Sequence, residues 1–200
     1  MVDSQHLLHY DVAGGGSMKF STKEINRVGI FAALHVAAAM MLRYGGPAVV
    51  PFSLVPFMAF LAAFTLGGRL GALSLAVYAL LGLMGVPVFA RAPFGGLTYV
   101  LQPTFGFIIG FIVAAYFAGQ FDINTRRGAA LAMVVGVAVL YLVGVPYLVA
   151  VIRFYLGRPF TWQRAFEVAV APFIVLDFVK VFVAVLLARA IKKRLPYISN

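Results

Sequence analysis

Apolar segments long enough to cross the ~30 Å hydrocarbon core of a bilayer recur along almost the whole chain. Hydrophobic residues make up 63% of the 200 residues and charged residues only 11%, whereas a soluble domain is about half apolar and about a quarter charged. Little of the chain is left over for a soluble domain. The sequence therefore predicts an all-α, polytopic membrane protein with a single membrane domain.

Glycine, proline and basic residues divide the chain into six expected helical spans. A capping pattern at Ser21 and Glu24 precedes the first span, which the segment 43–47 is expected to end. The fifth span contains Pro146, where it could bend. The expected spans cover residues 25–42, an irregular entry at 51–56 with the run up to 67, and then 70–84, 104–117, 128–155 and 161–191.

Basic residues are distributed unevenly between the two faces that these spans define. One face holds Lys19, Lys23, Arg27, Arg69, Arg126, Arg127, Arg189, Lys192, Lys193 and Arg194, and the other holds Arg43, Arg91, Arg153, Arg158 and Arg164. Because cytoplasmic loops carry the excess of Lys and Arg, both termini are expected in the cytoplasm. The net charge of +10 lies in short clusters without a basic stripe, so no nucleic-acid partner is expected.

The first residues of the chain differ from the rest. Residues 1–17 are polar and end in Gly14-Gly15-Gly16-Ser17, directly before a second methionine, Met18. We interpret residues 1–17 as an expression tag and linker, and residues 18–200 as the membrane domain. The chain has no cysteine, which excludes disulfides and thiolate chemistry.

Asp177 and Lys180 are an ionisable pair within the last apolar span. Their i, i+3 spacing places both side chains on one helical face. A charged residue in the middle of a span costs roughly 2.5–3.5 kcal/mol on insertion scales and usually faces a cavity or the interior of the helix bundle. The pair could be a structural ion pair, but we favour a binding site for a ligand with a urea, amide or carboxylate group.

The outer connection at residues 88–102 is a second candidate. It combines Gly95 and Gly96 with Phe and Tyr residues and is expected to be a packed loop. The paired glycines could let the backbone approach a ligand, although an amphipathic interfacial cap would have a similar composition. In the first span, Ala33 and Ala37 form a small-residue face that permits close helix packing, within the bundle or with a partner.

Enzymatic motifs are missing from the sequence. There is no HExxH, GxSxG, phosphate-binding glycine loop or dense acidic cluster. We expect no catalytic residue, no metal site and no cofactor in this chain. A pore is not expected either, because one Asp/Lys pair makes a charged ring only if the chain oligomerises.

Several segments, taken in order, resemble a known family. They are residues 66–74, residues 81–89, Gly95-Gly96 before residues 103–106, residues 141–147, and Pro172-Phe173 with Asp177 and Lys180. Together they resemble the BioY family, the biotin-binding S components of energy-coupling-factor (ECF) transporters. The resemblance covers nearly everything after Met18.

The resemblance implies a six-helix S component in the bacterial cell membrane that binds biotin from the outer face and performs no chemistry itself. It implies that Asp177 and Lys180 contact biotin, and that the loop before the fourth span covers the pocket. It also implies that Ala33 and Ala37 dock on a transmembrane EcfT subunit. Two further subunits would hydrolyse ATP, which is therefore a partner's cofactor.

Three positions depart from the family pattern. Phe57, Phe94 and Ile108 stand where some members have Gln, Asn and Arg. Other groups must then hold the acid end of the ligand, and we name Arg91, Tyr99 and Gln102 as candidates for this role. A more apolar pocket could instead favour lipoate or dethiobiotin. A non-transporting membrane scaffold with a structural ion pair is the remaining alternative.

Overall fold

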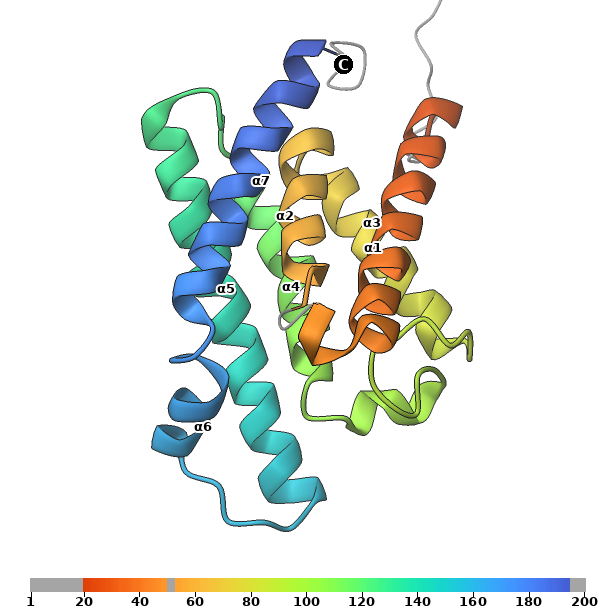
Figure 1. The fold of residues 1–200 in the computed structure, drawn as a ribbon, viewed down its shortest axis with the longest axis vertical. Helices are drawn as coiled ribbons and strands as arrows, with labels where there is room; N and C mark the ends of the chain where they lie inside the picture. The colour runs from red at the N-terminus through yellow and green to blue at the C-terminus, as the bar shows by residue number, and fades with distance from the viewer. Residues whose placement is uncertain (1–19, 50–52, 195–200) are drawn as a thin grey trace, which may run out of the picture.

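A computed structural model describes residues 20–49 and 53–194, and over these residues the chain folds into helices joined by loops, without strands (Figure 1). The expected tag at residues 1–17 lies outside the described residues. The helices are α1 (Thr22–Val49), α2 (Val55–Leu66), α3 (Gly68–Leu83), the 3₁₀ helix η1 (Leu97–Leu101), α4 (Phe105–Ala118), α5 (Arg126–Ala150), the π-helical turn η2 (Val151–Tyr155), α6 (Trp162–Ala169) and α7 (Ile174–Arg194).

The first and last expected spans differ from their predicted form. The prediction that residues 43–47 end the first helix is wrong, since α1 continues to Val49. Proline and glycine are tolerated inside membrane helices, where neighbouring groups satisfy the freed backbone. The sixth span is not one helix either, because α6 and α7 meet at an angle of 49°. Pro172, in the break, lacks an N–H and disfavours helical geometry at the residue before it.

The lengths of the helices suit a membrane protein. Within the described part of the chain, two helices are long and apolar enough to cross a bilayer, namely Thr22–Gly45 of α1 and Arg126–Tyr155, which joins α5 and η2. The bent pair of α6 and α7 counts as a third if it is one span. Helices α2, α3 and α4 are apolar but shorter. Pro146 lies inside α5.

Glycines bring the central helices into close contact. A Cβ atom at Gly71 of α3 would lie 2.6 Å from the Cα atom of Ala63 in α2. A Cβ at Gly144 of α5 would lie 2.5 Å from the ring of Phe107 in α4. Around these contacts, Phe60, Phe64 and other apolar side chains form one continuous core. Such close packing sets the rotation of each helix and so decides which side chains face inward.

The connections gather at two opposite ends of the bundle. Figure 1 places the start of α1, the α4–α5 turn and the end of α7 at one end, and the loop around η1 and the η2–α6 connection at the other. Arg189 of α7 joins elements of the first end, since its guanidinium donates to the carbonyl oxygens of Ile123 (2.6 Å) and Thr125 (3.3 Å). This grouping agrees with the two faces expected from the basic residues.

The connection between α3 and α4 is a packed loop, as predicted. Phe89 is fully buried and its ring stacks on Tyr99 with centroids 4.0 Å apart. The guanidinium of Arg43, from α1, lies 3.7 Å from the centroid of the Phe94 ring and donates to the carbonyl oxygen of Pro87 at 3.2 Å. The loop is thereby held against the bundle by α1 as well as by the helices that it joins.

Candidate functional site

A cavity of about 480 Å³ lies between the helices and the α3–α4 loop. This volume is within the range of ~300–1,000 Å³ that is typical of small-molecule pockets. Its wall is mostly apolar, with polar groups at a few positions. The lining residues are Leu42, Ser53, Val55, Pro56, Tyr78, Ala90, Arg91, Tyr99, Thr104, Phe107, Ile108, Phe111, Leu140, Tyr141, Leu148, Val168, Ala169, Phe173, Asp177 and Lys180.

Asp177 lies at the centre of a cluster of polar side chains in this cavity. Asp177 is only 6% exposed, and both of its carboxylate oxygens accept a hydrogen bond. Lys180 Nζ donates to Oδ1 at 3.0 Å, and the Tyr141 hydroxyl donates to Oδ2 at 2.7 Å. Asp177 also stands in the first turn of α7, where the helix dipole favours a negative charge. The carboxylate is therefore fixed in orientation while its remaining lone pairs are available to a ligand.

Tyr141 is held in place by the packing between α4 and α5. The ring of Phe107 meets the Tyr141 ring edge-to-face with centroids 6.4 Å apart. Phe107 lies where Gly144 leaves room for it. The three residues are close in space because α4 and α5 are antiparallel neighbours joined by a short turn.

Arg91 and Tyr99 line the cavity from the α3–α4 loop, and Thr104 lines it just before α4. Arg91 is exposed and Tyr99 is buried. Burial raises the pKa of the Tyr99 phenol, so this hydroxyl stays neutral at physiological pH and can donate a hydrogen bond. A guanidinium and two hydroxyls at this position can bind a carboxylate.

Gly95, Gly96 and Gln102 do not line the cavity. A Cβ at Gly95 would lie 2.5 Å from the carbonyl oxygen of Val86, so this glycine permits a close approach within the loop itself. Gly96 has φ +94° and its N–H donates to the carbonyl oxygen of Gly82 at 2.7 Å. Gln102 Nε2 donates to the carbonyl oxygen of Ala92 at 3.0 Å. These residues shape the loop that carries Arg91 and Tyr99.

Of the three positions that depart from the family pattern, Ile108 lines the cavity and Phe57 and Phe94 do not. Sequence reasoning missed Tyr141 and Thr104. Nothing in the sequence indicates that Tyr141 lies beside Asp177, because the two residues are 36 positions apart on different helices. Thr104 stands at the predicted start of a span and could have been named with the loop residues.

The small-residue face of α1 points away from the core. Ala33 and Ala37 are exposed, and Gly29, one turn earlier, has no atom within 4 Å of the position of a Cβ. His35 faces the opposite way and is fully buried, where its ring stacks on Tyr78 with centroids 6.0 Å apart. Gly29, Ala33 and Ala37 therefore form a flat exposed stripe to which another helix could pack closely.

The fold and the cavity together define a helical membrane protein with a binding site for a small molecule. Comparison with known proteins gives a more specific result. The model of the BioY family matches residues 14–197, and the chain belongs to the BioY family.

Several relatives are similar along most of their length. A "Probable biotin transporter BioY" of Lysinibacillus sphaericus is 38% identical, with 86% of this chain and 88% of the relative covered. The "Biotin transporter BioY" of Thermotoga maritima is 36% identical, with 86% and 96% covered. These relatives are named as transporters, in agreement with the expectation that the chain is not an enzyme.

A solved structure has the same fold. It is the crystal structure of "the S-component for biotin from an ECF-type ABC transporter", with a TM-score of 0.70 and 19% identity, and the match covers 88% of this chain and 95% of that chain. At this level of identity the likeness concerns the fold.

Proposed function

We propose that this chain is the biotin-binding S component of an ECF-type importer in the bacterial plasma membrane. It crosses the membrane six times, the bent pair of α6 and α7 counting as one span, and both termini lie in the cytoplasm. The names of its BioY relatives support biotin as the solute. The observation that carries the proposal is the hydrogen-bonded cluster of the buried Asp177 with the partly buried Lys180 and Tyr141, on the wall of a mostly apolar cavity.

This cluster matches the chemistry of a ureido group. The two N–H groups of a cyclic urea need acceptors, which the Asp177 carboxylate supplies, and the urea oxygen needs a donor, which the Lys180 ammonium supplies. The apolar ring and chain of biotin would contact Phe107, Ile108 and the other apolar lining residues. Fold stability alone is a weak explanation for this ion pair, because a protein in which apolar residues replace a buried ion pair is often equally stable or more stable.

The acid end of biotin lies against the α3–α4 loop in this proposal. Arg91 supplies the positive charge, and the Tyr99 and Thr104 hydroxyls are further donors on the same part of the cavity wall. Gly95, Gly96 and Gln102 contribute by holding the loop in shape. In this proposal, Arg91, Tyr99 and Thr104 take the place of the arginine that some family members have at the position of Ile108.

Partner subunits complete the proposed transporter. The stripe of Gly29, Ala33 and Ala37 would dock on a transmembrane EcfT subunit, because small residues let two helices approach closely. Two ATPase subunits would then supply the energy, and ATP is their cofactor.

Ligand binding by the purified protein tests the proposal. Calorimetry in detergent should show tight biotin binding to the wild type, and Asp177→Asn and Lys180→Ala should each weaken it about 10-fold or more, since each removes a charged hydrogen bond worth ~1.5–3 kcal/mol. Lys193→Ala is the matched control, because Lys193 is an exposed lysine on the same helix. Unchanged affinity in both site variants would refute the proposed site.

A related acid is the second candidate, favoured by Ile108 in the cavity wall. A thermal-shift series with biotin, dethiobiotin and lipoate separates these ligands, because the true ligand stabilises by about 2.7 kcal/mol at 100 times its Kd. A scaffold protein would respond to none of them. Mass spectrometry of the protein after denaturation would identify any small molecule that was retained during purification.

A further inference from the structure

We propose that the connection between α5 and α6 contains a binding site for the phosphate of an anionic phospholipid. This connection lies at the end of the bundle where the α3–α4 loop also lies (Figure 1). Its residues line a hollow. It is separate from the biotin cavity and shares no lining residue with it. Its lining residues are Arg153, Gly157, Arg158, Pro159, Phe160 and Thr161.

Two arginines line this hollow, and neither has an acidic partner among the described residues. Within residues 20–49 and 53–194, neither Arg153 nor Arg158 forms an ion pair. Arg153 donates through Nε to the carbonyl oxygen of Phe160, which fixes its side chain across the turn and leaves its terminal nitrogens for another acceptor. Two guanidiniums on one hollow favour a phosphate, because its oxygens accept paired N–H bonds.

The backbone of this segment is shaped in an unusual way. The end of α5 changes to a π-helical turn, in which the N–H of Leu156 donates to the carbonyl oxygen of Val151 at 3.0 Å. The N–H of Arg158 then donates to the carbonyl oxygen of Ile152 at 3.1 Å, and Gly157 adopts φ +63°. These contacts turn the chain so that Arg153 and Arg158 meet at the same hollow. Such π turns often occur at functional sites.

Exposed aromatic residues indicate that the anion carries an apolar tail. Phe154, beside Arg153 in the chain, is 87% exposed, and Tyr155 is 57% exposed. Trp162, the only tryptophan, follows Thr161 and is 55% exposed. Tyr and Trp are enriched at the depth of the lipid headgroups in membranes. A phospholipid satisfies both features, with its phosphate at the arginines and its acyl chains beside the aromatic rings.

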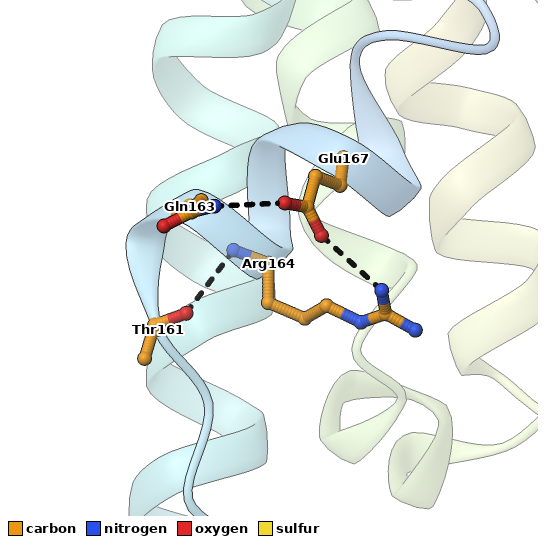
Figure 2. A network of polar contacts seen from close by, with 4 residues as sticks. All are labelled: Thr161, Gln163, Arg164 and Glu167. Atoms are coloured by element: carbon orange, nitrogen blue, oxygen red, sulfur yellow. Dashed lines mark hydrogen bonds and ion pairs between the residues drawn. The ribbon is translucent and has the colours of Figure 1, made fainter.

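Arg164 offers a matched comparison. It is exposed at the start of α6, three residues after Thr161, which lines the hollow. Its guanidinium, however, is paired with Glu167 at 3.2 Å. Figure 2 shows this pair together with two hydrogen bonds, from the Arg164 backbone N–H to Thr161 Oγ1 and from Gln163 Nε2 to Glu167 Oε1. The positive charge of Arg164 is thus already compensated within α6, whereas the charges of Arg153 and Arg158 are not.

Native mass spectrometry of the detergent-purified chain, titrated with phosphatidylglycerol or phosphatidylcholine, tests the site. The wild type should bind phosphatidylglycerol about 10-fold tighter than phosphatidylcholine, because phosphatidylcholine carries a choline cation beside the same phosphate and the two arginines repel it. This preference corresponds to ~1.4 kcal/mol. The double variant Arg153→Gln/Arg158→Gln should lose this preference, and Arg164→Gln should keep it. Arg158→Gln alone should reduce the preference without disturbing the turn, because the Arg158 side chain makes no hydrogen bond or ion pair within residues 20–49 and 53–194.

Three results would overturn the proposal. The first is equal binding of the two lipids by the wild type. The second is an equal loss of preference in Arg164→Gln and in the double variant, which would indicate a general effect of charge. The third is competition by inorganic phosphate or glycerophosphoglycerol at the concentration of the intact lipid, which would indicate a site for a free anion. Biotin binding measured on each variant reports whether the bundle is intact and stands independently of the lipid result.

Discussion

Replacing Tyr141 by Phe removes one hydroxyl and leaves the ring that packs against Phe107. The lost bond is the 2.7 Å donation to Asp177 Oδ2, made to a carboxylate that is 6% exposed. Hydrogen bonds to charged groups contribute ~1.5–3 kcal/mol, and each 1.4 kcal/mol corresponds to a factor of about ten in Kd. If the proposed ureido contact depends on the orientation of the carboxylate, Tyr141→Phe should weaken biotin binding about 10- to 100-fold.

A double-mutant cycle separates this positioning role from a general loss of structure. Calorimetry in detergent gives the affinities of Tyr141→Phe, Asp177→Asn and the double variant. If Tyr141 acts through the Asp177 carboxylate, the tyrosine substitution should have little further effect once Asp177 is replaced. Tyr147→Phe is the matched control, because the Tyr147 hydroxyl donates to the backbone of Val100 and its side chain does not line the cavity.

Two results would refute this reasoning. One is an affinity of Tyr141→Phe equal to or above that of the wild type, which would mean that the hydroxyl does not orient the carboxylate for the ligand. The other is full additivity in the cycle, which would mean that Tyr141 affects binding independently of Asp177. An equal loss in the Tyr147 control would point to a general effect of removing a tyrosine hydroxyl from α5 instead.

Further predictions concern the loop, the helix contacts and the docking stripe. Arg91→Gln should weaken biotin at least 10-fold but leave biotin amide unaffected, and equal losses for both ligands in calorimetry would exclude a carboxylate contact. Gly71→Ala should destabilise the protein by ~1–3 kcal/mol, because the added Cβ would overlap the backbone of α2. Gly29→Ala should be neutral or stabilising, because nothing lies within 4 Å of its Cβ position and alanine favours a helix. Thermal unfolding in detergent compares the two variants. Ala33→Trp and Ala37→Trp should abolish biotin uptake by cells while the purified variants bind biotin normally, and unaffected uptake would exclude docking through this stripe.

The sequence alone predicted a helical membrane protein, the packed α3–α4 loop and the pairing of Asp177 with Lys180 on one helical face. These features depend on local pattern. The length of an apolar run sets what a bilayer can accept, and a spacing of three residues puts two side chains on one helical face. The aromatic residues of the loop likewise indicated packing without any knowledge of their partners.

Only the tertiary structure decided which groups meet across helices. It placed Tyr141 on Asp177, put Arg91 and Tyr99 rather than Gln102 on the cavity wall, and broke the last span between α6 and α7. These results depend on the rotation of each helix about its axis. That rotation is set by close contacts between helices, such as those at glycine positions, which join residues far apart in the chain and leave no periodic signal in the sequence.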